Sequence, residues 1–433
     1  MNRIKKYLKE LFPGSVLLFT VAHFMHHVPG FIIQGIQTSL ISQFSLTHYQ
    51  VGLVSRSYNL AYGAGNLPAG WLGGRIAPRL LITIGVVGVA IFAFVSGFSP
   101  TYAFLLVAML FVGLLGGGYH ACAAPVVSDT VDQEKRGKAL GVHQIGGTAA
   151  NMIVPVAAAA IATALTWRWS YFILTVPIVI FGVVLYVMMT RRHLGDTPKL
   201  TAMPVAGTEP NNQVRLRPLI AFMIAGTSVQ IFVYSALYFV QSLVVEQFHG
   251  PQLLGGVMFA LSQFGGLFAG PLGGHISDRI GRVPVMVAVS LVAGPLVFAL
   301  GIVNTWWLLP FALLAVGACQ YVAMPVTEAY VIGSTSTRNR SAILGIYYFA
   351  SRGGPGLLTP IIGSLIDNKG YGLAFGYTGA ILFGISIICT ILMFGVKNIW
   401  NLVPSLEAYE SWKDTLKWIF LMKANKYDST DKH

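Results

Sequence analysis

The sequence predicts an all-α membrane protein whose twelve transmembrane helices form two pseudo-symmetric six-helix bundles. Three observations carry this prediction. Of the 433 residues, 55% are hydrophobic and only 10% are charged, which is far from the composition of a water-soluble domain. Apolar runs of about 20 residues, the length that crosses a bilayer as a helix, recur along the chain. Loop motifs of the first half also return in the second half.

The predicted spans follow one another in order, with short loops between most of them. They cover residues 14–41, 50–73, 79–98, 102–128, 138–164, 168–190, 218–245, 252–276, 283–303, 306–333, 341–366 and 372–395. Residues 191–217 are rich in Pro, Thr, Asn and Arg, which is the composition of a linker. We therefore expect an N-terminal bundle (1–190), a linker (191–217), a C-terminal bundle (218–396) and a tail (397–433). In the tail, Ser405 is the predicted cap of an amphipathic helix.

The basic residues orient the spans. Of the 28 Lys and Arg residues, all but Arg56, Arg168, Arg352 and Lys369 flank the same side of the predicted spans. By the positive-inside rule this side and both termini are cytoplasmic, in a multi-pass protein of a cell membrane of the bacterial inner-membrane type. The net charge of +13 is then a topology signal. Basic residues scattered over short loops argue against a nucleic-acid partner.

The two halves match each other at an offset of 204 residues. The segment "GWLGGRIAPRLL" after the second span aligns with "GHISDRIGRVPV" after the eighth, so that Gly70 matches Gly274 and Arg75 matches Arg279. The same offset aligns "KRGKALG" with "NRSAILG". Parallel repeats of this kind are typical of transporters whose site lies between the halves near the middle of the membrane.

A polar stripe follows one helical face of the first span. Its positions are spaced i, i+3, i+4, i+7, i+11 and i+14, and they hold His23, His26, His27, Gly30, Gln34 and Gln37. The repeat offset places a second polar stripe on the seventh span, at Thr227, Gln230, Tyr234, Tyr238 and Gln241. Polar side chains that face lipid are costly, so we expect spans 1 and 7 to meet across a central polar cavity. Hydrogen bonding between the helices is the alternative.

Charged residues inside the spans are few. Arg352 lies about eleven residues into span 11, roughly 16 Å deep, where a cation implies a partner or an aqueous site. Arg56 is nearer the outer end of span 2, and its side chain can extend to the surface. The acid Glu328 either pairs with Arg338, Arg340 or Arg352, or carries protons.

These patterns predict a central solute site. Its candidates are His23, His27, Gln34, Gln37, Arg56, Asn59, His120, Gln144, Asn151, Gln230, Tyr234, Tyr238, Gln241, Gln263, Tyr348 and Arg352. Imidazole titrates near neutral pH, so the candidate proton carriers are His23, His27, His120 and Glu328. The three histidines could also hold a metal or a metal complex. No carboxylate or thiolate completes that set, so we predict neither a metal site nor a cofactor. No nucleophile, base and third group stand at a catalytic spacing, so we predict no enzyme.

One loop carries a family resemblance. The segment after span 8 resembles the major facilitator superfamily signature Gly-x-x-x-Asp-Arg-x-Gly-Arg, at Gly274, Asp278, Arg279, Gly281 and Arg282. The copy after span 2 has Gly74 in place of the acid. The resemblance implies the major facilitator fold and a gating role for Arg75, Arg79, Asp129, Asp278, Arg279 and Arg282. Because Gly74 carries no charge, we expect Arg75 and Arg79 to pair with Asp129, Asp132 or Glu134.

Three further segments resemble the fosmidomycin-resistance branch of exporters. They are "QFSLTHYQVGL" (43–53), "GGGYH" (116–120) and "HQIGGTAANMIVP" (143–155). The resemblance implies a secondary active transporter that works by alternating access and exports a solute or drug in exchange for protons. The predicted lining, rich in His, Gln, Tyr and Arg and poor in acids, favours a small anionic or polar-aromatic solute. Its partners are then a small-molecule solute, protons and the lipid bilayer, and we expect a monomer. Proton-coupled uptake of an organic anion is one alternative, and a non-transporting sensor or lipid-handling protein is another. Substrate, direction and stoichiometry stay open.

Overall fold

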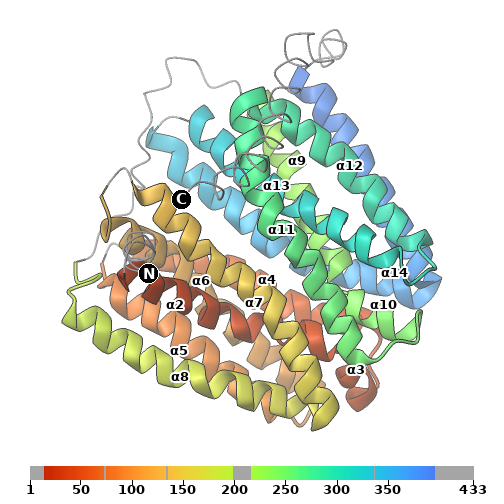
Figure 1. Cartoon of the computed structure of the whole chain (residues 1–433), viewed down its shortest axis with the longest axis horizontal. Helices are drawn as coiled ribbons and strands as arrows, with labels where there is room; N and C mark the ends of the chain where they lie inside the picture. The colour runs from red at the N-terminus through yellow and green to blue at the C-terminus, as the bar shows by residue number, and fades with distance from the viewer. Residues whose placement is uncertain (1–13, 73–74, 133–134, 198–215, 336, 395–433) are drawn as a thin grey trace, which may run out of the picture.

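The computed structural model describes residues 14–72, 75–132, 135–197, 216–335 and 337–394, which are mostly helical (Figure 1). The N-terminal half comprises α2 (Gly14–Phe31), α3 (Ile33–Phe44), α4 (His48–Leu72), α5 (Pro78–Gly97), α6 (Tyr102–Asp129), α7 (Arg136–Ala164) and α8 (Trp167–Arg191). The C-terminal half comprises α9 (Leu216–Leu237), α10 (Val240–Glu246), α11 (Gln252–Ile280), α12 (Arg282–Ile302), α13 (Leu309–Ser334) and α14 (Thr337–Phe394).

The described helices match the twelve predicted spans. Helices α2 and α3 together form the first span, and α9 and α10 together form the seventh. Ten described segments are long and apolar enough to cross a membrane, and one of them, α14, contains two predicted spans. Gly370, with a φ of 76°, interrupts the helix between those two. The one predicted span that is not among these segments is the second, which corresponds to the less apolar α4. The predicted tail helix at Ser405 lies outside the described residues.

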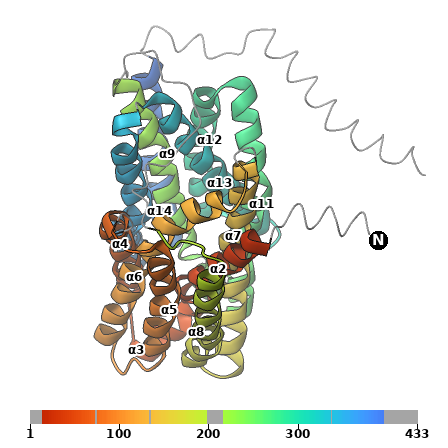
Figure 2. The ribbon, with the colours of Figure 1, turned by 90° about the vertical axis from the view of Figure 1, so that its left-hand side faces the viewer.

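The helices form two groups that follow the two halves of the sequence. In Figure 1, α2–α8 lie together and α9–α14 lie together, and the groups diverge toward the side where α2 begins. The turned view in Figure 2 separates the same groups, with α5 and α8 remote from α9 and α12. We call the end at which α2 begins and α8 ends the inner end. The outer end is where α3 ends and α4 begins.

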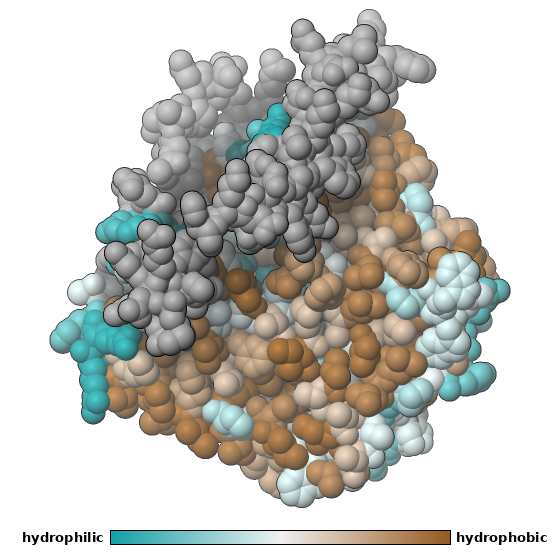
Figure 3. All heavy atoms as spheres, viewed as in Figure 1, coloured by the Kyte–Doolittle hydropathy of each residue, from teal (hydrophilic) through white to brown (hydrophobic). Residues whose placement is uncertain are grey.

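The flanks of the bundles carry an apolar surface. Figure 3 shows hydrophobic side chains covering most of the face between the two ends, while hydrophilic ones gather near the ends. Large apolar residues such as Ile91, Val107, Ile180, Val183 and Phe298 are 45% to 63% exposed. An apolar surface of this extent fits contact with lipid, because helices satisfy their own backbone hydrogen bonds there.

Close backbone packing joins the two bundles at the outer end. A Cβ atom on Gly52 of α4 would lie 2.6 Å from the Cα of Pro360 on α14. A Cβ atom on Gly363 of α14 would collide with the carbonyl oxygen of His48. Only glycine permits helices to approach this closely. We call this α4–α14 contact, through Gly52 and Gly363, the outer seam.

Candidate functional site

Arg352 lies where the two bundles meet. It is partly exposed on α14, and its charge interacts with Tyr62 of α4, Tyr234 of α9 and Tyr321 of α13. Within the part of the chain that the structure describes, its guanidinium forms no hydrogen bond and no ion pair. Guanidinium has five N–H donors and no acceptor. A cation at this depth in a span implies a partner or an aqueous site.

The acid Glu328 lies near Arg352. It is partly exposed on α13, accepts a hydrogen bond from the hydroxyl of Tyr348, and interacts electrostatically with Arg352. No ion pair within 4.0 Å joins Glu328 to another described side chain. The side chains of Arg338 and Arg340 lie outside the described ones. The charge of Glu328 therefore compensates Arg352 without occupying its donors.

Tyrosines and amides surround this pair. Asn151 of α7 donates to the hydroxyl of Tyr321 at 3.0 Å, and that hydroxyl donates to Gln263 of α11 at 2.9 Å. This chain of hydrogen bonds connects the N-terminal bundle to the C-terminal bundle. Gln230 of α9 donates to the hydroxyl of Tyr347 at 2.6 Å. These groups can accept and donate hydrogen bonds to a polar solute.

Sequence reasoning missed Tyr321 and Tyr347. At the repeat offset of 204 residues, Tyr321 corresponds to Gly117, which has no polar side chain. Comparison of the halves therefore carried no signal there. Tyr347 corresponds to the buried His143, and that pair of polar residues at equivalent positions was the available signal. Asn59 and Gln263, both predicted, are also related by the offset.

Spans 1 and 7 contact each other directly through their glutamines. The side-chain pairs are Gln37 with Ser242 at 3.0 Å, Gln241 with Thr38 at 2.9 Å, and Gln34 with Tyr234 at 3.3 Å. Gln37 also donates to the backbone carbonyl of Tyr238. The side-chain hydroxyl of Tyr238 in turn donates to the backbone carbonyl of Val51 on α4. Asn59 bonds to Tyr234 as well. The alternative of hydrogen bonds between helices therefore describes this part of the stripe.

The histidines of the same stripe face the interior of the N-terminal bundle. His26 donates from Nδ1 to the carbonyl of Gly85 on α5 at 3.0 Å, and its Nε2 lies 3.1 Å from the hydroxyl of Tyr62. The prediction that the whole stripe faces span 7 is wrong for this residue. His26 lies in α2, which packs against α5, α6 and α7, whereas the glutamines lie in α3, which also packs against α10 and α11 of the other bundle.

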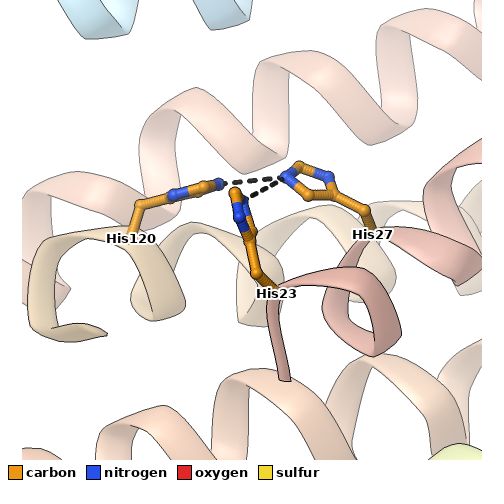
Figure 4. A group of neighbouring side chains, drawn as sticks. All are labelled: His23, His27 and His120. Carbon is orange, nitrogen blue, oxygen red and sulfur yellow. Dashed lines mark hydrogen bonds between the residues drawn. The ribbon is translucent and has the colours of Figure 1, made fainter. Parts of the chain in front are cut away.

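His23 and His27 of α2 meet His120 of α6 (Figure 4). The Nε2 of His27 is 3.1 Å from the Nε2 of His23 and 3.2 Å from the Nε2 of His120. The ring of His23 stacks on that of His143, with ring centroids 4.3 Å apart. His23 and His27 are buried, and His120 is partly exposed. The three histidines that the sequence analysis grouped, His23, His27 and His120, are therefore in contact.

Two predicted solute-binding residues lie apart from this group. Arg56 is exposed on α4 in a groove lined by Leu53, Leu60, Leu106 and Leu110. Gln144 is exposed on α7, beside the exposed Ile145. The apolar lining around Arg56 is that of a lipid-facing surface, so Arg352 is the stronger candidate for binding a solute.

The loop after the second span, which carries Arg75 and Arg79, is held by a different acid from the predicted ones. Arg79 forms an ion pair with Asp196, which follows α8, and not with Asp129 at the end of α6 or with Asp132. Gly195, at a φ of 68°, turns the loop so that its carbonyl accepts the Arg79 amide at 3.1 Å. Asp132 pairs with Lys135 at 3.0 Å, and Glu134 lies outside the described residues. The prediction for Arg75 stays a prediction.

The loop after the eighth span, which carries the complete signature, contacts the neighbouring helix α13. Arg282 donates to the carbonyl of Ala329 on α13 at 2.6 Å. Asp278 is exposed at the inner end of α11, and its carboxylate forms no hydrogen bond or ion pair with the described residues. The carboxylate of the signature thus has no partner among the described residues at the end where the bundles diverge.

The sequence matches the model of the Major Facilitator Superfamily twice, over residues 19–261 and 223–419. This chain belongs to the Major Facilitator Superfamily. The chain is therefore a multi-pass membrane protein of a transporter family, and not one of an enzyme family.

Its relatives are transporters whose names indicate different substrates. A probable 4-methylmuconolactone transporter of Cupriavidus pinatubonensis is 25% identical over 59% of this chain and 60% of that protein. The chain thus spans less than two thirds of that relative's length. The multidrug resistance protein MdtG of Citrobacter koseri is 23% identical over 72% of this chain and 78% of that protein. The crystal structure of a bacterial homolog of the human lysosomal transporter Spinster shares the fold, at a TM-score of 0.67 and 16% identity, over 90% of this chain and 98% of that chain.

A polar cluster closes the outer end of this facilitator. His48, at the start of α4, bonds through Nδ1 to Asp367 at 2.8 Å and through Nε2 to Glu246 at 3.1 Å. The Tyr371 hydroxyl lies 2.9 Å from the same Nε2. Asp367 also accepts the backbone amides of His48 and Tyr49, both at 2.8 Å, so it caps α4 from the other bundle. We call His48, Glu246, Asp367 and Tyr371 the outer latch.

The outer latch favours a protonated histidine. Burial lowers the pKa of His48, but the hydrogen bonds and charges of Glu246 and Asp367 outweigh burial and raise the pKa above 6.5. Partial burial raises the pKa of Asp367, but the amides of Tyr49 and His48 outweigh it and lower the pKa below 3.8. With a carboxylate at each ring nitrogen, both nitrogens of His48 act as donors.

We expect closure of the outer end to weaken as the pH rises. The raised pKa means that protonated His48 stabilises the latch below that pKa, and this contribution is lost as the pH rises through it. Asp367, with its lowered pKa, stays charged over this range. The distance between spin labels at Ala164 and Asn304, which lie at the outer ends of the two bundles, should lengthen with rising pH. The variant His48→Gln should show no such dependence, and an unchanged pH response in that variant would contradict the assignment.

Proposed function

We propose that this facilitator transports small organic anions together with protons, by alternating access. The observation that carries the proposal is Arg352, whose guanidinium has no described partner between the two bundles. A carboxylate is the ligand that satisfies such a group through charge-assisted hydrogen bonds. Tyr234, Tyr321 and Gln263 supply further hydrogen bonds and aromatic faces for the rest of the solute.

Glu328 supplies the coupling to protons. While it is ionised, its charge compensates Arg352 and competes with an incoming anion. A proton on Glu328 removes this competition, so proton binding raises the affinity for the anion. By linkage, the anion raises the affinity for the proton by the same factor. Proton and anion then cross together, which is the uptake alternative from the sequence.

Alternating access accounts for the arrangement of the two ends. The outer seam and the outer latch hold the outer end shut, while Asp278 at the inner end has no partner among the described residues. Opening the outer end requires the latch to separate, and the inner signature then engages its partners. We infer from the basic loops that the inner end and both termini are cytoplasmic, in a cell membrane of the bacterial inner-membrane type.

Export in exchange for protons is the second candidate. Two observations favour it: the multidrug resistance relative aligns with 72% of this chain, and segments 43–53, 116–120 and 143–155 resemble the fosmidomycin-resistance exporters. In that case the proton and the solute compete for the site, with His23, His27, His120 or Glu328 as the carrier. The direction of proton flow relative to solute flow separates the two candidates.

The test uses purified protein in liposomes with a pH-sensitive dye inside. The probes are 4-methylmuconolactone, benzoate and gluconate, each offered without a proton gradient. Cotransport predicts that inward movement of the anion makes the lumen more acidic. Exchange predicts that it makes the lumen more alkaline. No transport of any of these anions would remove the proposal.

We expect Glu328→Gln to separate solute movement from proton movement. The amide is close in shape to the carboxyl but cannot ionise, so the site stays in its proton-bound form. Exchange of labelled anion for unlabelled anion should continue within about threefold of the wild-type rate, while uphill accumulation driven by a pH gradient is lost. Wild-type accumulation in this variant would contradict the role of Glu328 as the proton carrier. The control is Thr190→Val, an uncharged substitution at an exposed position near the end of α8, away from the site.

A further inference from the structure

Three imidazole nitrogens converge at one point inside the N-terminal bundle. The Nε2 atom of His27 is 3.1 Å from that of His23 and 3.2 Å from that of His120, and the three ligand atoms all lie within 4.8 Å of one another (Figure 4). Nitrogens bound to one tetrahedral zinc ion at about 2.05 Å stand about 3.3 Å apart. Two of the three separations therefore already fit a common ion.

The hydrogen bonds around the cluster leave ring lone pairs for such an ion. His23 donates from Nδ1 to the carbonyl of His143 at 2.9 Å, so in its neutral form Nε2 holds a lone pair. A backbone carbonyl on the far ring nitrogen is the support that metal-binding histidines usually have. The Nδ1 of His27 has no partner among the described atoms, so no hydrogen bond there determines which nitrogen carries the proton.

Hydrogen bonding alone satisfies this cluster poorly. The Nε2 of His27 faces two other Nε2 atoms, and a proton on it can point fully at only one of them. One proton is thus shared among three nitrogens that lie together. A cation accepts a lone pair from each of them at once. Buried polar groups left with incomplete hydrogen bonds call for such an explanation.

We propose that His23, His27 and His120 form an exchangeable binding site for a divalent transition-metal ion. Imidazole suits zinc, copper and nickel and does not suit magnesium or calcium. Three protein ligands leave one position open, which is typical of sites that exchange ligands. The group contains no carboxylate, and the charge of Arg352 acts on all three rings. Both features weaken the hold on a dication, and so favour a site that releases its metal. The site does not depend on the proposed anion transport.

The experiment is a zinc titration of the full chain in detergent, purified without a polyhistidine tag. We expect one zinc ion to bind saturably, magnesium not to bind, and cobalt to give the visible absorption of a four-coordinate nitrogen site. His27→Gln should weaken zinc binding at least about 100-fold. His120→Gln, at a partly exposed position, should do the same and guards against misfolding of the buried variant.

The matched control is His26→Gln. His26 lies on the same helix and is equally buried, but its ring nitrogens face Gly85 and Tyr62, not the cluster. We expect this variant to bind zinc like the wild type. The absence of saturable zinc binding by the wild type, or equal affinity in all three variants, would overturn the proposal. An equal loss in His26→Gln would also overturn it, because the loss would then follow from disturbing the bundle. The zinc titration does not depend on anion uptake, so its result tests the metal site and leaves the proposed anion transport untouched.

Discussion

Arg352→Ala should abolish saturable transport of carboxylates. The substitution removes the guanidinium, which has no hydrogen-bond partner in the described part of the chain, and with it one or two charge-assisted hydrogen bonds to the solute. Bonds of this kind contribute about 1.5–3 kcal/mol each, so the affinity should fall roughly 100-fold. Arg352→Lys keeps the charge but loses the planar fork of donors, and should retain part of the affinity. Initial rates of benzoate uptake into liposomes, measured over a range of concentrations, check both variants.

The matched control is Arg56→Ala. Arg56 is also an arginine within a predicted span, but it is exposed in an apolar groove on the flank of α4. We expect its removal to change transport less than about threefold, because a charge that extends to the membrane surface need not touch the solute. Full activity of Arg352→Ala, or an equal loss in the two alanine variants, would remove the anion argument.

Gly363→Leu should hold the outer end open and stop transport. A side chain at this position meets the backbone carbonyl of His48, which cannot rotate away as a flexible side chain can. Overpacking of this kind costs about 1–3 kcal/mol, which shifts the equilibrium against the closed outer end roughly 5- to 150-fold. Spin labels at Ala164 and Asn304 should then report a longer distance at every pH. Transport should fall at least about tenfold, while the protein stays folded because each bundle keeps its own packing.

The control for this change lies on the same helix. A Cβ atom on Gly384 meets no atom within 4 Å, so Gly384→Leu adds the same side chain to α14 without touching α4. We expect wild-type distances and near wild-type transport in that variant. If Gly363→Leu left the label distance unchanged, the outer seam could not be the contact that keeps the outer end shut.

The parts of the fold that the sequence predicted are those controlled by composition and repetition. Twelve apolar runs and one offset were sufficient for the number of spans and their grouping into halves. Arg352 could be recognised because a cation deep in a span is costly wherever its helix points. These properties belong to single segments or to the chain compared with itself, so no knowledge of packing was needed.

What the sequence left open depends on how distant segments meet. Arg79 pairs with Asp196 because Gly195 turns the loop after α8 toward α5, and a positive φ is not visible in a string of residues. His26 bonds to α5 and not to span 7 because α2 packs within the N-terminal bundle, whereas the glutamines of α3 lie against α10 and α11. Hydrophobic periodicity locates a helix but not the neighbour of each of its faces.

The cap on α4 has a consequence for the independence of the two halves. The first amides of this helix are satisfied by Asp367, which belongs to the other bundle. Whenever the halves separate at that edge, the amides of His48 and Tyr49 pass from Asp367 to water, and only the local cap between Thr47 and Gln50 remains on the first turn. The N-terminal domain expressed by itself would therefore begin α4 with a weaker cap, because one carboxylate of the C-terminal domain completes that helix end.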